Sequence, residues 1–243
     1  MGGTPGPVDV PREIALGAVQ SIRRQGVDTA VSFAMEVDHG FSQVLKRVAG
    51  GIAAYPVLPV FMCCIQPPFV PFARARALGE AVGSYAKTLN KDKILFIGTG
   101  GLSHNPYIVF PPITDAEMGQ EWKPYILHGK KQTKVPQQDW IDWEFEAHKE
   151  AAQMFAGFEG PPEEVGVIEK WDRALLKDYC AGDLAQFDAW EAEQIMADAG
   201  IGAVEVQSWI AAAQAMKSAS GADPKTTFQR GMRELGIAEA GPV

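Results

Sequence analysis

FARARALGEAVGSYAKTLNKDKILFIGTGGLSH, residues 72–104, is the stretch that decides the expected fold. Apolar and small residues recur every three to four positions through residues 72–89, which is typical of an amphipathic helix. Residues 93–98, KILFIG, then form a β-branched and aromatic run that ends in glycine, and this pattern predicts a buried strand. A helix that leads directly into a strand indicates an α/β unit.

The same alternation runs through the residues that precede this stretch. We expect helices over residues 10–24 and 41–48, and strands over residues 28–35 and 56–62. The first hundred residues therefore predict an α/β fold with a layered sheet flanked by helices.

The second half of the chain has a different character. Residues 106–136 are rich in Pro, Gly and Lys, and we expect a long irregular excursion there. A helix-rich C-terminal half should follow, with these expected helices: residues 137–158, 168–179, 184–199, 203–218 and 226–235.

Composition excludes several classes of function. The chain has 243 residues, of which 47% are apolar, and this length can bury a core without disulfides. A formal net charge of −8 argues against a nucleic-acid partner, because phosphate binding needs clustered Lys and Arg. Cys63, Cys64 and Cys180 form neither a disulfide framework nor a CxxC zinc motif. With no apolar run long enough to cross a bilayer, we expect a cytoplasmic protein with no membrane partner.

Two of the four histidines follow predicted strands, where ligands of open α/β sheets bind. His39 lies in EVDHGFSQ, where the neighbouring Asp38 could orient its ring or cap the following helix. His104 lies in TGGLSH, after glycines that permit close approach of the backbone to a ligand. From these residues alone, His104 could be a satisfied loop residue, a metal ligand or a proton carrier.

Glu205 lies in GAVEVQSW, near the start of a predicted helix and among apolar residues. A carboxylate at this position could simply complement the helix dipole. By contrast, His128 and His148 lie in charged surroundings and are interpreted as surface residues, and the adjacent cysteines as packing residues.

Four segments in this order carry a family resemblance: AVSFAMEVDHGFSQ, PVLPVFM, RARALGEAVGSYAKTLNKDKILFIGTGGLSHNP and AVEVQSWIAA. Together they resemble the class III (LigB-type) extradiol ring-cleavage dioxygenases. The likeness is strong over about residues 5–106, and it returns at residues 168–171 and 205–209. It implies meta cleavage of a catechol by O₂, with a 2,3-dihydroxyphenyl acid or another 3-substituted catechol as substrate.

The resemblance also implies a set of site residues. In that family two histidines and a glutamate hold a non-haem Fe(II), and Glu205 matches the glutamate. His39 and His104 match two further histidines that act as acid and base, with His104 as the base and His39 as the acid. A ligand face of this kind leaves positions on iron for a catecholate and for O₂. Relatives of this family form oligomers, so a homo-oligomer is expected.

Neither of the family's two iron-binding histidine motifs, SHSP and DHYNGF, occurs in this sequence. The resemblance therefore implies a single catalytic domain over residues 1–243 that lacks the family's N-terminal strands and holds Fe(II) weakly on its own. Two alternatives stay open. One is a non-catalytic binding protein on the same scaffold, and the other is a zinc-dependent hydrolase that uses Glu205 and the histidines.

Overall fold

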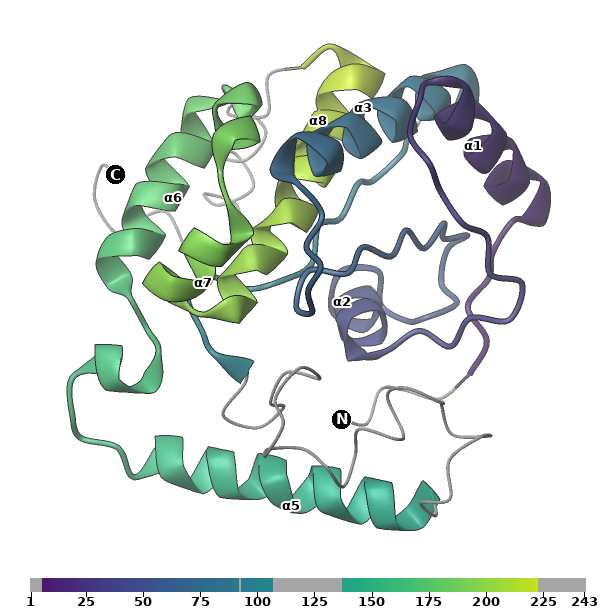
Figure 1. Ribbon diagram of the computed structural model, residues 1–243. Helices are drawn as coiled ribbons and strands as arrows, with labels where there is room; N and C mark the ends of the chain where they lie inside the picture. The colour runs from purple at the N-terminus through teal and green to yellow at the C-terminus, as the bar shows by residue number, and fades with distance from the viewer. Residues whose placement is uncertain (1–5, 92, 107–136, 223–243) are drawn as a thin grey trace.

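The computed structural model describes residues 6–91, 93–106 and 137–222, and these residues are arranged around packed helices (Figure 1). The α-helices and 3₁₀ helices are, in chain order: α1 (Arg12–Arg24), α2 (His39–Val48), α3 (Phe72–Thr88), α5 (Gln137–Ala156), η2 (Pro162–Val165), α6 (Glu169–Ala181), η3 (Leu184–Ala189), α7 (Ala192–Ala199), η4 (Ile201–Glu205) and α8 (Val206–Ser220). Among the described residues, no helix has both the length and the apolar character needed to cross a bilayer.

Helices α3 and α8 pack against each other with their backbones in close approach. A Cβ atom built on Gly79 would lie 2.2 Å from the carbonyl oxygen of Ala211, and one on Gly83 would lie 2.2 Å from that of Ala215. Glycines four residues apart fall on one face of a helix, so they form a shallow groove that the alanines of α8 occupy. This contact fixes α8, whose first turn carries the site described below.

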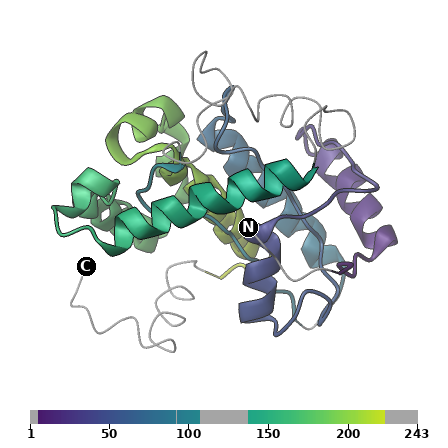
Figure 2. The same cartoon turned by 90° about the horizontal axis from the view of Figure 1, so that it is seen from below.

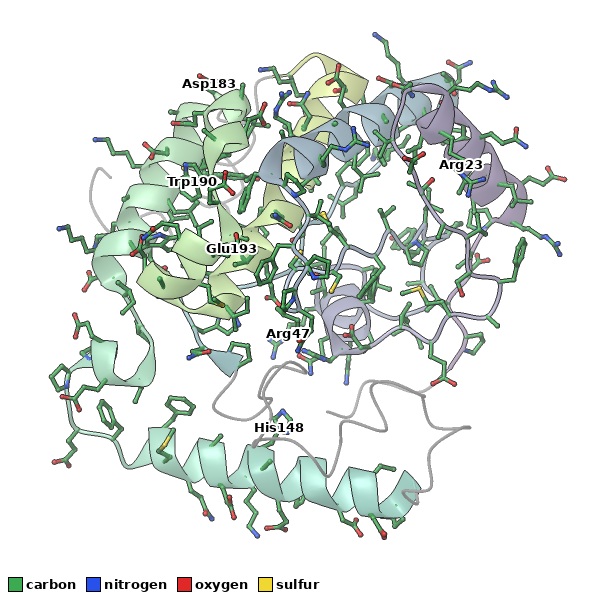
Figure 3. The ribbon with its side chains drawn as sticks, in the orientation of Figure 1. Arg23, Arg47, His148, Asp183, Trp190 and Glu193 are labelled. Carbon is green, nitrogen blue, oxygen red and sulfur yellow. The ribbon has the colours of Figure 1, made fainter. Side chains whose placement is uncertain are left out.

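The main hydrophobic core lies between α8, the start of α3 and the helices α6, α7, η3 and η4. Its fully buried side chains include Phe72, Leu175, Phe187 and Ile210. Phe187 packs edge-to-face on Trp190 with ring centroids 4.8 Å apart, an arrangement that aromatic pairs favour. Trp190 is labelled in Figure 3 between α6 and α7.

A smaller cluster joins α1 to α3. Ala18 and Ile22 of α1 pack against Ala81 of α3. The Tyr85 hydroxyl donates a hydrogen bond to the carbonyl oxygen of Ile14 at 3.0 Å, and Gly17 leaves room for that hydroxyl.

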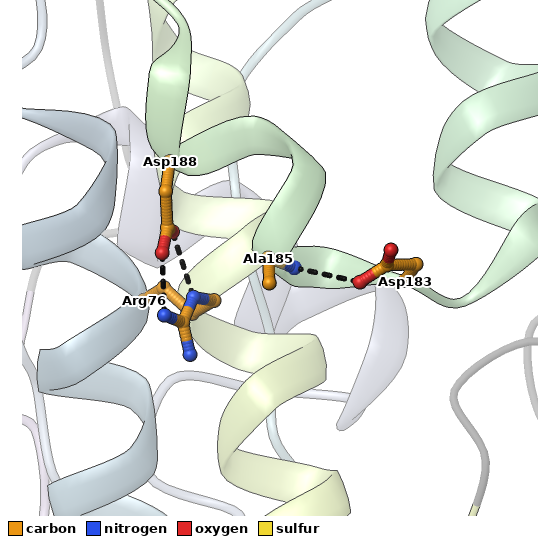
Figure 4. A network of polar contacts seen from close by, with 4 residues as sticks. All are labelled: Arg76, Asp183, Ala185 and Asp188. Carbon is orange, nitrogen blue, oxygen red and sulfur yellow. Dashed lines mark hydrogen bonds and ion pairs between the residues drawn. The ribbon is translucent and has the colours of Figure 1, made fainter.

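One ion pair connects α3 to the short helix η3 (Figure 4). Arg76 Nε donates to Asp188 Oδ1 at 2.7 Å, and Arg76 Nη2 donates to Asp188 Oδ2 at 2.5 Å. The same short helix is capped by Asp183, whose Oδ1 accepts the N–H of Ala185. Because the guanidinium donates both bonds in one plane, this pair also fixes the orientation of the two helices.

The expected layered sheet is wrong for the described part of the chain, in which the structure assigns no strand. The three segments that we expected to be strands are irregular, and they form no ladder of backbone hydrogen bonds with one another. They are residues 28–35, 56–62 and 93–98. Their β-branched and aromatic composition favours an extended chain, but a strand also needs a partner that accepts its backbone hydrogen bonds. Several of their large apolar side chains are exposed, including Phe33, Phe61 and Leu95.

The expected helices are largely confirmed, with two differences. The helix expected over residues 184–199 is divided into η3 and α7, because Trp190 adopts an extended conformation with ψ of 138°. The helix expected over residues 203–218 begins as 3₁₀ helix and becomes α-helix at Val206. The excursion expected over residues 106–136 and the helix expected over residues 226–235 lie outside the described residues, apart from Pro106.

Helix α5 lies at the periphery of the molecule, below the other helices in Figure 1 and in front of them in Figure 2. Several of its apolar side chains are exposed, among them Phe145 and Phe155. It carries His148 (Figure 3), while His128 lies outside the described residues.

Candidate active site

The loop at residues 98–101 lies directly on the N-terminal end of α8. A Cβ atom on Gly98 would lie 2.6 Å from the carbonyl oxygen of Ser208, and one on Gly100 would lie 2.6 Å from Cβ of Glu205. Gly100 has a φ of +143°, which side chains rarely tolerate. The hydroxyl of Ser208 hydrogen-bonds to the carbonyl oxygen of Thr99. Gly98 and Gly100 are therefore required by the close approach of this loop to the start of α8.

Glu205 ends η4, and its side chain turns toward this loop. The backbone N–H of Gly101 donates to Glu205 Oε2 at 3.1 Å, and the carboxylate caps no N–H in the first turn of α8. Burial raises the pKa of Glu205, while the charges of His104 and His39 and the N–H of Gly101 act in the opposite direction. The carboxylate is thus half-buried and within electrostatic reach of both candidate histidines.

The imidazole of His104 has a defined orientation. Its Nδ1 lies 2.7 Å from the carbonyl oxygen of Leu102. A carbonyl oxygen only accepts hydrogen bonds, so Nδ1 carries the proton. In the neutral ring Nε2 then holds the free lone pair, and this is the nitrogen that can accept a proton.

Glycines surround the His104 ring on two sides. A Cβ atom on Gly202 would lie 2.2 Å from the ring, and one on Gly101 would lie 2.4 Å from its Cε1 atom. The backbone is held as well, because His104 N–H donates to the carbonyl oxygen of Ala199 and its own carbonyl oxygen accepts the N–H of Gly202, each at 3.1 Å. The position of His104 is therefore set by both its backbone and its ring.

His39 enters the site from the first turn of α2. Asp38 caps this helix, since its Oδ1 accepts the N–H of Gly40 at 2.9 Å. The other carboxylate oxygen of Asp38 lies 4.0 Å from Nδ1 of His39, whose side chain is 40% exposed. A Cβ atom on Gly40 would lie 3.8 Å from Oγ1 of Thr99, so the start of α2 adjoins the glycine loop. Of the two roles considered for Asp38, helix capping is the one with a hydrogen bond.

The cysteines differ from one another in exposure. Cys64 is buried, and burial together with the charge of Glu205 raises the pKa of its thiol to about 12. It is therefore protonated at neutral pH and packs as an apolar residue, as expected. Cys63 is exposed, so the expectation of a packing role is wrong for that residue.

A cavity of about 660 Å³ lies away from these residues. It is lined by Trp171, Trp190 and residues of α7 such as Ile195, and none of the three candidates contributes to it.

Comparison with known proteins identifies the family of this chain. Residues 4–233 match the family described as the catalytic LigB subunit of aromatic ring-opening dioxygenase. This chain belongs to the LigB family. It is 39% identical over 217 residues to 2,3-dihydroxyphenylpropionate/2,3-dihydroxicinnamic acid 1,2-dioxygenase 2 of Dechloromonas aromatica (strain RCB), a match that covers 89% of this chain and 65% of that protein.

Two further LigB-related proteins carry the name 2,3-dihydroxyphenylpropionate/2,3-dihydroxicinnamic acid 1,2-dioxygenase. The protein from a Rhodococcus species is 35% identical over 229 residues, covering 94% of this chain and 69% of its own length. The protein from Azotobacter vinelandii (strain DJ / ATCC BAA-1303) is 33% identical over 236 residues, covering 96% of this chain and 71% of its own length. The chain thus spans about two thirds of the length of the curated relatives it matches.

Membership of a ring-opening dioxygenase family implies a metal cofactor. Glu205 offers a carboxylate of the right kind, half-buried and next to two imidazoles. Within the described residues, however, no group of three His, Cys, Asp or Glu side chains is arranged to hold a metal ion. The described residues alone therefore do not form a metal centre.

Several residues that shape this LigB site were not found by sequence reasoning. Gly200 and Gly202 closely approach the backbone and the ring of His104. Asp172, 69 residues after Ser103 in the chain, accepts a hydrogen bond from the N–H of Ser103. Only Ser103 could have been noticed in the sequence, because it is part of the GGLSH motif. The partner of Ser103 is visible only in the folded chain.

Proposed function

We propose that this LigB chain serves in the extradiol (meta) ring cleavage of a catechol by O₂, with Fe(II) as the metal. The names of its relatives favour a 2,3-dihydroxyphenyl acid as the substrate. The observation that carries the proposal is the placement of His104, in one defined tautomer, on a loop that contacts Glu205 and adjoins the start of α2 with His39.

His104 is the base in this proposal. A catechol must lose protons to bind a metal through both oxygens, and an imidazole with a free Nε2 can accept one near neutral pH. The Leu102 carbonyl oxygen holds the proton on Nδ1, so the ring presents Nε2 to the substrate without first changing its tautomer. The carboxylate of Glu205 would stabilise the imidazolium that forms, since each lies within electrostatic reach of the other.

His39 is the acid. Its side chain is more accessible to solvent than a core residue, so the ring can recover a proton after it has donated one to the substrate. Its position at the first residue of α2, which Asp38 caps, brings it to the neighbourhood of Thr99 in the glycine loop.

Glu205 is the one ligand that we assign to Fe(II). The ion would activate O₂ toward the bound catechol, and the described residues offer no group of three side chains that would complete its site. We also propose one catalytic domain, since the family match runs over residues 4–233. We propose a cytoplasmic location as well, which cysteines that form no disulfide favour. The exposed apolar side chains of residues 28–35, 56–62 and 93–98 support self-association into a homo-oligomer.

Oxygen uptake tests the proposal. The purified chain, supplied with excess Fe(II) and 2,3-dihydroxyphenylpropionate, should consume O₂ and form a ring-opened product in equal amounts, but slowly, because Glu205 is its one assigned ligand. Rapid turnover would show that the iron site of this chain is complete. Oxygen uptake that does not depend on any 3-substituted catechol would overturn the proposal. Retention of zinc together with hydrolytic activity would favour the hydrolase instead.

Variants assign the roles of the two histidines. His104→Ala and His39→Ala should each lower kcat by about 10²–10⁴-fold, the usual contribution of a general base or acid. His148→Ala on the peripheral helix α5 is the matched control and should keep the original rate. Unchanged rates in both site variants would remove the assigned roles.

A further inference from the structure

Ser103 directly precedes His104. Both its N–H and its hydroxyl form hydrogen bonds with residues at the start of α6. It is buried, with 7% of its surface exposed. Its N–H donates to Asp172 Oδ1 at 2.7 Å, and its hydroxyl donates to Asp172 Oδ2 at 2.8 Å. The same hydroxyl oxygen accepts the N–H of Ile168 at 2.7 Å. One carboxylate therefore holds both the backbone and the side chain of this residue.

The position of Asp172 suits this clamp. Asp172 lies in the first turn of α6, where the helix dipole favours a negative charge. Hydrogen bonds to a carboxylate are shorter and stronger than those between neutral groups. Ile168 immediately precedes α6, so its N–H would otherwise be one of the unsatisfied groups of the helix start. The loop and α6 thus satisfy each other's polar groups.

His104 is held from two sides as a result. On one side Asp172 holds Ser103, and on the other the backbone of His104 bonds to Ala199 and Gly202. The ring has little room to adjust, because Gly101 and Gly202 leave no space beside it. A shift of the Ser103 backbone would therefore move the imidazole and its bond to the Leu102 carbonyl oxygen.

We propose that Asp172 is a positioning residue of the active site, which acts through Ser103 to fix where Nε2 of His104 lies. This inference rests on the proposed function for its kinetic consequence. It does not rest on that function for its structural consequence, which is a change in the hydrogen bond at Nδ1 of His104.

The alternative is a purely structural role, in which Asp172 only anchors α6. Both roles predict a lower melting temperature when the carboxylate is removed. Only the positioning role predicts that kcat of the folded enzyme falls while KM changes little, since displacing a catalytic group by about 1 Å can cost 10²-fold in rate.

The test compares Asp172→Ala and Asp172→Asn with Glu169→Ala. Glu169 is the matched control, because it is also a first-turn carboxylate of α6 and pairs with the exposed Arg173 of the same helix. Asp172→Ala should lower kcat about 10²-fold. Asp172→Asn keeps one acceptor oxygen and should recover part of that loss, and Glu169→Ala should keep the original kcat.

Nuclear magnetic resonance of the ¹⁵N-histidine-labelled chain gives a readout that needs no turnover. The Nδ1 signal of His104, assigned with His104→Ala, should shift in Asp172→Ala and stay unchanged in Glu169→Ala. An unchanged Nδ1 signal in folded Asp172→Ala would overturn the inference, whatever the activity. A shifted signal in a chain without ring cleavage would uphold the positioning and refute the proposed function instead.

Discussion

Two regions of this chain use apolar residues in opposite ways. Where α3 meets α8, glycines and alanines bring two backbones together, and the large side chains around them, such as Phe72 and Ile210, are fully buried. In residues 28–35, 56–62 and 93–98, larger and more apolar side chains remain in contact with solvent, with Leu95 68% exposed. Hydrophobicity alone therefore does not decide burial here. A facing surface of matching shape does.

The largest loss of stability should follow the removal of a fully buried side chain from the core. Phe187 is 0% exposed and packs on Trp190, so Phe187→Ala removes a complete buried ring and leaves a cavity. We expect the free energy of unfolding to fall by about 4 kcal/mol. Urea-induced unfolding followed by circular dichroism measures this loss, and a change below about 1 kcal/mol would contradict the packing described here.

Overfilling the α3–α8 contact should cost slightly less. In Gly79→Ala the new Cβ would meet the carbonyl oxygen of Ala211, a backbone atom that can move only with its helix. We expect a loss of about 3 kcal/mol, at the upper end for overpacked cores. Gly51→Ala is the matched control, because its nearest neighbour would lie 3.9 Å away, and the urea midpoints of the two variants should differ clearly.

The active site is packed as closely as the contact between α3 and α8, and Gly202→Ala tests this. The new Cβ would lie 2.2 Å from the His104 ring, so the imidazole must move away from its bond with the Leu102 carbonyl oxygen. We expect kcat for ring cleavage to fall by about 10²-fold, which corresponds to about 2.7 kcal/mol. Gly157→Ala, whose new Cβ would make an ordinary 3.6 Å contact, should keep the original rate.

The Arg76–Asp188 pair should contribute a smaller and pH-dependent amount. The hydrogen bonds and charge of Arg76 hold the pKa of Asp188 below its usual value. The stabilisation is therefore present above the unfolded-state pKa and is lost as the pH falls through the folded-state pKa. Both side chains are partly exposed, so we expect Arg76→Ala to cost about 1 kcal/mol at pH 7.

Thermal unfolding of Arg76→Ala and the original chain at several pH values checks this expectation. The two melting temperatures should differ at pH 7 and converge in acid, once Asp188 is protonated in the folded state. A difference that stays constant down to the lowest pH would show that packing of the Arg76 stem, and not its charge, stabilises the chain.

The helices of this fold could be predicted from sequence, whereas the prediction of a sheet was wrong for the described residues. The helix expected over residues 72–89 is observed at Phe72–Thr88, because a 3.6-residue period is a local property that one segment carries by itself. The KILFIG run predicts only that a segment is extended. Whether it becomes a strand depends on a partner ladder elsewhere in the chain, and residues 93–98 have none among the described residues.

The site could be predicted in part for a similar reason. His39, His104 and Glu205 lie in short motifs, so the resemblance located them, and the structure brings them into one neighbourhood. Their roles stay a prediction. Asp172 and Gly202 matter only through contacts with a loop far away in sequence, and no local pattern distinguishes such an Asp or Gly from others.

The exposed side of the comparison should show the smallest effect on stability. Phe61 is 60% exposed, so Phe61→Ala removes the same ring as Phe187→Ala from a place where water already surrounds most of it. We expect a change within about 0.5 kcal/mol in urea unfolding. Phe61→Ala should instead reduce self-association, because exposed apolar side chains favour contacts between molecules. Light scattering across a concentration series should therefore report less association for Phe61→Ala than for the original chain. If Phe61→Ala instead destabilised the chain as much as Phe187→Ala, residues 56–62 would be buried in solution and the contrast between the two regions would fail.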